Sequence, residues 1–301
     1  MIIKYLISFI IFKIINFLPP GKICNLLNFF LVVYLGSNHK RRLWNLKKSI
    51  LKQRSHDFEK IYFKSQKKCK RIFIFVGDSH AEFYGRNFIN NDSKKIFFTF
   101  HTGPTLLTTF GTSRKIIIKI FEFIKFIQKY FSKNKPEVNI VFSFGEIDVR
   151  TYFYQELKLD KNFLNEKEFL NFISNQFAEN FKYLKSLISM NKIKNINFLF
   201  KEMTPQTYSK YFTPKNSFQL NKIRNKNEFP VFGKLKDRVM WSKKLSIKMK
   251  SICSQNKIKF IKLSYNVYDK NRSLNKKITF DNGHISNLSD LVDVQNKAIL
   301  K

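Results

Sequence analysis

The chain has 301 residues, enough for one sizeable α/β domain with an extension, and 44% of them are apolar, which supports a buried core. Lysine and arginine number 56 against 21 acidic residues, and the formal net charge of +35 favours contact with phosphates, anionic lipid or acidic glycans. The basic residues are spread along the whole chain without a zinc-finger spacing or an RNA-recognition signature, so nucleic acid is not the expected partner.

Residues 1–36 form an apolar segment that Pro19-Pro20-Gly21 interrupts. Neither apolar half reaches the ~20 residues that a spanning helix needs, and a double proline does not continue a helix. Three interpretations remain open: an interfacial helix pair in one leaflet, a helical extension packed on the domain, and a signal peptide, although no small-residue cleavage site follows. We favour the interfacial pair. If the segment contacts membrane, the basic cluster His39-Lys40-Arg41-Arg42 indicates that the following domain faces the cytoplasm. Residues 37–70 are basic and polar, which is typical of a linker to a domain at 71–301.

The first strand is predicted over 71–77, where isoleucine, phenylalanine and valine are followed by Gly77. The next residues are Asp78 and Ser79, so Ser79 is expected at the carboxyl end of a buried strand, where open α/β sheets bind ligands. A helix that begins there offers free N–H groups to an anion. A serine in this place acts as a nucleophile if a base reaches it, whereas the same residues are also good helix caps.

The rest of the domain alternates strands and helices, which predicts a three-layer α/β/α fold with a mainly parallel five-stranded sheet. We expect the flavodoxin-like strand order 2-1-3-4-5, in which the ends of the first three strands meet at one place. The stretch 203–237 is too long for an ordinary loop and is expected to form a lid or a substrate wall. The predicted strands are 71–77, 96–100, 138–144, 196–200 and 257–263, and the predicted helices are 113–131, 166–190, 239–255 and a closing helix after residue 284.

Two of these helices carry apolar residues at helical spacing, which we expect to face the core. The stripes are Ile117, Ile120, Phe121, Ile124 and Ile127 in the first helix, and Phe169, Phe172, Ile173, Phe177, Phe181 and Leu184 in the second. The three cysteines are far apart, which argues against a disulfide framework and a zinc site and suits a reducing, cytoplasmic compartment. We expect Cys24, Cys69 and Cys253 to be buried and inert.

Acidic residues follow the third predicted strand, in the sequence Gly145-Glu146-Ile147-Asp148, with Arg150 close behind. The two acids are interpreted either as solvated residues at a strand end, as a structural ion pair with Arg150, or as participants in the chemistry. Near the end of the chain, Asp281 precedes His284 by three residues in a turn that contains Gly283. Such a turn can aim His284 at Ser79 while Asp281 holds the imidazole in the required tautomer. The alternative is an Asx-turn beside a surface histidine.

The order Ser, Asp, His with the last two in one short turn resembles the SGNH/GDSL hydrolase family over roughly residues 71 to 295. Gly77-Asp78-Ser79 matches the first block of that family, and Asp281 with His284 matches its Asp-x-x-His last block. The resemblance implies that Ser79 is the nucleophile, His284 the base and Asp281 the residue that orients the base. It implies an acyl-Ser79 intermediate, no cofactor, and an acylated small molecule, glycan or lipid as substrate. A basic, membrane-facing chain makes an acylated glycan or a lipid-linked saccharide the first choice.

Two further blocks complete the resemblance and one of them departs from the family pattern. Gly103, in the loop after the second strand, matches the glycine whose N–H joins that of Ser79 in the oxyanion hole. The third block of the family is Gly-x-Asn-Asp, but Ile147 occupies the asparagine position here. Loss of such a donor typically costs about 10²–10³ in rate. We expect Arg150 or His101 to replace it, with Asp78, Glu146 and Asp148 in auxiliary roles.

Two other functions stay open at this point. A non-catalytic binding domain that retains the fold is favoured by Ile147, which has no hydrogen-bond donor in its side chain. A metal-dependent phosphoesterase is suggested by the Asp-x-His pattern of Asp78 and His80. The residues that would complete its two-metal cluster are His101, Glu146, Asp148, Asp281 and His284, but the Gly-Asn-His and Gly-His-x-His blocks of that family are missing.

Overall fold

One five-stranded sheet forms the centre of the domain, and its strand order is β2-β1-β3-β4-β5 with every neighbouring pair parallel. The computed structural model describes residues 70–77, 95–101, 106, 114–131, 135–207, 210–226 and 230–275, and of 95–101 it describes the backbone alone. The order and the directions confirm the predicted flavodoxin-like sheet. The apolar segment 1–36, most of the linker 37–70 and the expected closing helix lie outside the described residues.

The predicted elements are found with small shifts in their bounds. The strands are β1 (Arg71–Gly77), β2 (Lys95–His101), β3 (Glu137–Ser143), β4 (Ile196–Lys201) and β5 (Lys259–Ile261), and the helices are α4 (Arg114–Tyr130), α5 (Glu166–Met190), α6 (Ser217–Lys226) and α7 (Leu235–Gln255). The third strand therefore begins and ends one position earlier than expected, the fifth is shorter, and α7 begins at Leu235 instead of residue 239. The stretch 203–237, which is expected to form a lid or a substrate wall, contains α6 and the start of α7.

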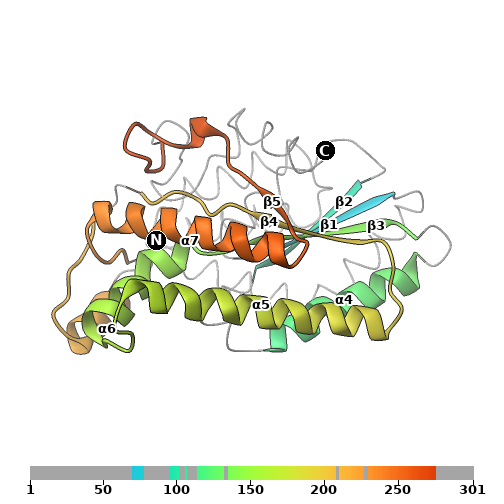
Figure 1. Cartoon of the computed structure of the whole chain (residues 1–301), viewed down its shortest axis with the longest axis horizontal. Helices are drawn as coiled ribbons and strands as arrows, with labels where there is room; N and C mark the ends of the chain where they lie inside the picture. Colours follow the sequence, from blue (N-terminus) through green and yellow to red (C-terminus); the bar gives the residue numbers. More distant parts are fainter. Residues whose placement is uncertain are drawn as a thin grey trace, which may run out of the picture.

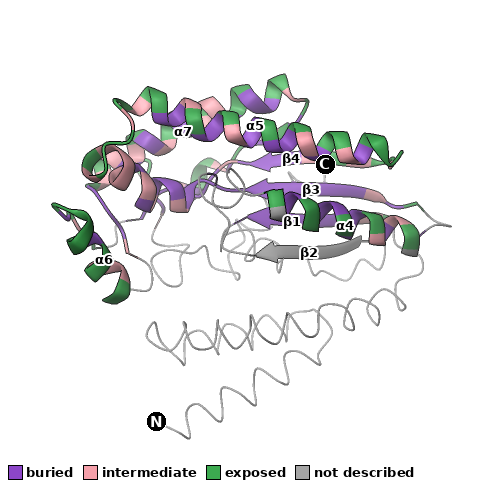
Figure 2. Cartoon of the chain, turned by 90° about the horizontal axis from the view of Figure 1, so that it is seen from below, coloured by how far each residue is buried: buried purple, intermediate pink, exposed green. Residues whose placement is uncertain are grey.

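Helices α4, α5 and α7 pack their apolar residues into one core with one face of the sheet (Figure 1). Alternation along the strands directs Ile72, Ile74 and Val76 of β1 to that face. Phenylalanine rings fill the interface, and the ring of Phe142 lies 5.6 Å from that of Phe177 in an edge-to-face arrangement. The predicted stripes of α4 and α5 are buried. Phe172 is the exception, because 37% of it is exposed. Figure 2 shows buried and exposed residues alternating along α5.

The start of α5 shows why the sequence places a helix there. The side chain of Asn165 accepts the backbone N–H of Glu168 at 3.0 Å, and the Glu168 carboxylate accepts the N–H of Leu164 at 2.9 Å. This reciprocal pair satisfies amides that the helix leaves unpaired, and the acids of the first turn complement the helix dipole.

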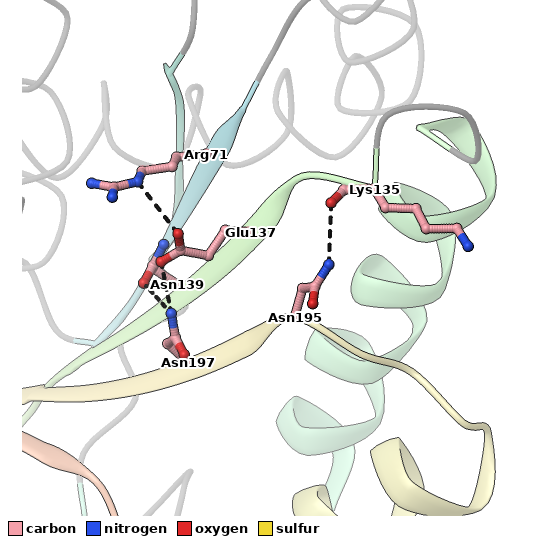
Figure 3. A network of polar contacts seen from close by, with 6 residues as sticks. All are labelled: Arg71, Lys135, Glu137, Asn139, Asn195 and Asn197. Carbon is pink, nitrogen blue, oxygen red and sulfur yellow. Dashed lines mark hydrogen bonds and ion pairs between the residues drawn. The ribbon is translucent and has the colours of Figure 1, made fainter.

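A polar network fixes the strand register at the amino edge of the sheet (Figure 3). Glu137 of β3 pairs with Arg71 of β1 at 3.3 Å and accepts the Asn197 side-chain amide of β4 at 2.7 Å. The same amide donates to Asn139 at 3.2 Å, and Asn139 is the residue paired with Asn197 in the strand register. Exposed ion pairs contribute little to stability, so the network acts mainly on alignment. It therefore helps to align the opposite, carboxyl edge, where the candidate site lies.

Within the described part of the chain, no helix is both long enough and apolar enough to cross a membrane. Cys253 on α7 is fully buried and free, and burial raises the pKa of its thiol to about 12. The thiol is therefore protonated at neutral pH, as expected for an inert core residue.

Candidate functional site

Three strand ends lie side by side at the carboxyl edge of the sheet. Gly77, the last residue of β1, is paired in register with His101 of β2 on one side and with Ser143 of β3 on the other. Because the three strands are parallel, the segments that follow them leave the sheet from adjacent positions. Ser79 is the second residue after Gly77, and Gly103 is the second after His101. The predicted convergence of the three strand ends is thus confirmed for the backbone.

Several predicted site residues lie outside the described residues: Asp78, Ser79, Gly103, Asp281 and His284, together with the side chain of His101. Their mutual geometry therefore stays a prediction. The third block, Gly145 to Arg150, is described completely, and the site is built here from that block and from its neighbours.

Gly145 turns the chain out of β3, and the turn requires a glycine. Its φ is +109°, a region that residues with a side chain rarely adopt. A Cβ atom at this position would lie 3.3 Å from Cδ2 of Leu245 and 3.4 Å from Sδ of Met203, which leaves no free space. The N–H of Val149 donates to the Gly145 carbonyl at 3.1 Å, so the chain enters a helical turn at once.

Glu146 and Arg150 form a buried ion pair on this turn. Oε1 of Glu146 lies 3.1 Å from Nε of Arg150, and the side chains are only 5% and 12% exposed. The interpretation of Glu146 and Asp148 as solvated acids is therefore wrong, because both residues are buried, whereas the expected ion pair with Arg150 is confirmed. Burial of a carboxylate is tolerated here because the guanidinium compensates its charge.

Asp148 connects the third block to the segment that follows β2. It is fully buried, and its Oδ2 atom accepts the backbone N–H of Leu106 at 3.0 Å. Leu106 is three residues beyond Gly103 in the chain. The carboxylate of the third block therefore holds Leu106, a residue of the segment that follows β2. This is a positioning role, and Asp148 is not required to touch a substrate to perform it.

Ile147 occupies the position where the family pattern has asparagine. Its side chain offers no donor, and its carbonyl accepts the hydroxyl of Thr151 at 2.5 Å. After it the chain forms two π-helical turns, Asp148–Tyr152 and Gln155–Leu159, which the sequence did not predict. Such turns are rare and are frequent at functional sites.

Sequence reasoning also missed a group of buried polar residues around the third block. Gln206, after β4, is 1% exposed and donates from Nε2 to the Glu146 carbonyl at 3.4 Å. Arg238 of α7 is fully buried. Burial lowers the pKa of Arg238 to about 10, and the nearby charge of Arg150 acts in the same direction while Glu146 opposes it. The guanidinium therefore stays charged at neutral pH.

A signal for Arg238 was present in the sequence. Arg238, Trp241, Leu245 and Met249 recur at helical spacing, and all four are buried on one face of α7. The predicted helix began one position too late to include the arginine in that stripe.

Metal ligation by the third block is not supported by the contacts of its carboxylates. Glu146 is paired with Arg150, and Asp148 accepts a backbone N–H. Among the described residues, no group of three histidine, cysteine or acidic side chains is placed to hold a metal ion. The other members of the predicted two-metal cluster are Asp78, His80, the His101 side chain, Asp281 and His284, which are not described.

No protein-family model and no curated protein matches the sequence. The chain is similar to solved structures of GDSL type and to other esterases. One is a GDSL-like lipase from Bacteroides thetaiotaomicron, with 16% identity over 77% of this chain and 85% of that chain and a TM-score of 0.39. An acetyl xylan esterase matches with 13% identity over 75% of this chain and 96% of that chain, with a TM-score of 0.37. A candidate platelet activating factor from Streptococcus pneumonia matches with 11% identity over 87% of this chain and 99% of that chain, with a TM-score of 0.47. Identities and TM-scores of this size carry no conclusion about the function of the chain.

Proposed function

We propose that the chain is a serine-dependent esterase or acyl-transfer enzyme that acts on an acyl ester through an acyl-Ser79 intermediate. One observation carries the proposal: Gly77, His101 and Ser143 are in register, so the three segments that hold the family blocks leave the sheet side by side. The Asp148 bond to Leu106 supports it, because it joins two of those segments. The substrate is proposed to be an acylated glycan or a lipid-linked saccharide, which suits the net charge of +35.

In the proposed reaction, His284 removes the proton of the Ser79 hydroxyl as its oxygen attacks the ester carbonyl. Asp281 stabilises the imidazolium, and the N–H groups of Ser79 and Gly103 donate to the oxyanion. The alcohol leaves with the proton from His284. Water or a sugar hydroxyl then attacks the acyl-serine, with His284 again as base, and releases the acid or a new ester. Arg150 is proposed to supply the donor that Ile147 lacks, because Glu146 holds its guanidinium on the same turn.

The test is labelling of purified protein with a fluorophosphonate probe. The wild type is expected to be labelled, and Ser79→Ala and His284→Ala are expected to abolish labelling because they remove the nucleophile and its base. Ser186→Ala is the matched control, since Ser186 is an exposed serine of α5 whose hydroxyl donates only to its own helix. Labelling that persists in Ser79→Ala would contradict the proposal, and a metal chelator is expected to have no effect.

A non-catalytic binding domain is the second candidate, and the apolar side chain of Ile147 is the observation that favours it. In that case a folded wild-type protein is not labelled, and Ser79→Ala leaves the affinity for any bound acylated glycan almost unchanged. We also propose that the chain is cytoplasmic and lies on the inner face of a membrane through residues 1–36. That proposal is independent of the chemistry.

A further inference from the structure

The chain between β4 and α7 makes a long excursion to the carboxyl edge of the sheet. Two of its described parts, 210–226, which includes α6, and 230–233, are together called the wall segment. Figure 2 shows that the strands run toward the end of the molecule at which α6 lies. The wall segment is therefore on the side of the sheet where the candidate site is expected.

The wall segment is attached to the π-helical turns by polar contacts along its length. The Ser217 hydroxyl donates to Oδ1 of Asp160 at 3.1 Å, and the Tyr154 hydroxyl donates to the Pro214 carbonyl at 3.3 Å. Nη2 of Arg224 donates to Oε1 of Gln155 at 2.8 Å. The same guanidinium lies over the rings of Tyr152 and Phe232, at 5.6 and 5.8 Å from their centroids. These contacts come from α6 itself and from the residues before it.

The returning end of the wall segment touches the third block directly. The N–H of Phe232 donates to the carbonyl of Arg150 at 2.9 Å, and Phe232 forms a short bridge with Phe212. Arg150 is the residue whose guanidinium pairs with Glu146. A displacement of Phe232 would therefore act on the backbone of a predicted site residue.

Arg238 joins the two ends of this excursion, Thr207 and Gly233, which together are called the neck. Nη2 of Arg238 donates to the carbonyl of Thr207, where the chain leaves the core, at 2.7 Å, and Nη1 donates to the carbonyl of Gly233, where it returns. A single planar fork thus holds the two ends together, which a flexible ammonium group does less well. The side chain has no exposed surface, and its Nε has no hydrogen-bond partner in the ranges that the structure describes.

Burying a guanidinium with an unpaired N–H costs free energy of folding, so a local interaction must compensate it. Its two carbonyl partners supply one, because they join ends of the chain that are far apart in sequence. Gly233 completes the neck, since its φ is +78° and a Cβ there would lie 2.9 Å from Cδ2 of Tyr154. Gly233 therefore has no room for a side chain, and the side chain of Arg238 beside it is not exposed to solvent.

We propose that Arg238 is a positioning residue that holds the wall segment against Arg150, and that the wall so fixed limits the size of the ester that reaches Ser79. The second half of this inference rests on the proposed function, whereas the first half does not. Arg238 acts through Thr207, Gly233 and Phe232 and touches no substrate.

The first measurement is amide hydrogen exchange followed by mass spectrometry on the full chain. Arg238→Met is expected to lose protection over 210–226 and 230–233 while β1, β3 and α5 keep theirs. Gly233→Ala is the second variant, because it disturbs the same neck without removing the charge, and it keeps the test open if Arg238→Met fails to fold. Lys236→Met is the matched control, since Lys236 is an exposed cation on the same helix. Unchanged hydrogen exchange in both Arg238→Met and Gly233→Ala would overturn the proposal that Arg238 holds the wall segment.

The second measurement is kcat/KM for p-nitrophenyl acetate and p-nitrophenyl octanoate. In Arg238→Met and Gly233→Ala, the octanoate-to-acetate ratio of kcat/KM is expected to rise about tenfold, because a displaced wall segment no longer excludes the longer acyl chain. Fluorophosphonate labelling of Ser79 is expected to persist, and Arg238→Lys should restore part of the wild-type ratio. An unchanged ratio with raised exchange overturns the specificity role. If the wild type is not labelled and hydrolyses neither ester, the proposed function fails, and the specificity role fails with it. Hydrogen exchange still tests whether Arg238 holds the wall segment.

Discussion

At the scale of single residues, Asp148 has a buried carboxylate whose Oδ2 atom accepts the Leu106 N–H at 3.0 Å. Asp148→Ala leaves that amide without its partner, so the free energy of unfolding is expected to fall by about 1–3 kcal/mol. Asp148→Asn retains an accepting oxygen and should lose less. Urea unfolding measures both, with Glu179→Ala on the exposed face of α5 as control. Equal losses for Ala and Asn would contradict the assigned hydrogen bond and place the effect in the charge.

Ile147 shows that the backbone role of the third block is separate from the donor role of its asparagine position. The pattern Gly-x-x-Asp is retained because Gly145 has a positive φ and Asp148 holds a neighbouring segment, and neither role depends on an asparagine between them. The residue that donates to the oxyanion is a separate requirement, and its replacement leaves the turn intact. A sequence can therefore keep the backbone frame of the third block while another residue supplies the donor, which we propose to be Arg150.

At the scale of elements, the turn between β3 and the π-helical segment depends on Gly145. Gly145→Ala forces a side chain into a φ of +109° and brings a Cβ to 3.3 Å from Leu245. Backbone strain of this kind costs about 1–3 kcal/mol, and we expect a loss of that size in thermal or urea unfolding. Ser186→Ala on the surface of α5 should stay within about 0.5 kcal/mol of the wild type. A loss no larger than that of the control would show that the turn relaxes without strain.

The same scale explains which elements the sequence predicted. The helices α4 and α5 carry long apolar stripes, and β1 is an uninterrupted apolar run, so periodicity located them within one residue. Of the residues of α6, only Leu220 is buried among those described, which leaves no stripe to detect. The π-helical turns are five residues long each, too short for a repeating apolar pattern to be detected. Arg238 was missed because an arginine in a helix is normally solvated, and its burial depends on carbonyls from distant parts of the chain.

At the scale of the whole molecule, the parallel sheet explains why residues far apart in sequence can share one site. The register of β1 with β2 and β3 brings three segments to one edge, and the amino-edge network around Glu137 helps to hold that alignment. The identity of the reacting groups is not determined by this alignment. The reacting groups are predicted to be Ser79, Asp281 and His284, from the order of these residue types in the chain.

The net charge of +35 and the apolar residues 1–36 predict two separable contributions to membrane binding. Charge attraction to anionic lipid weakens as salt shortens the Debye length from about 10 Å at 0.1 M to about 3 Å at 1 M. Burial of an apolar helix face is not weakened in this way. In flotation with phosphatidylserine-containing vesicles, we therefore expect part of the wild-type binding to survive high salt. The double variant Ile10→Asp, Ile14→Asp should bind at low salt only, because it keeps most of the net positive charge and loses the apolar face. Complete release of the wild type by salt would exclude an interfacial role for residues 1–36 and leave electrostatic attraction as the sole cause of binding.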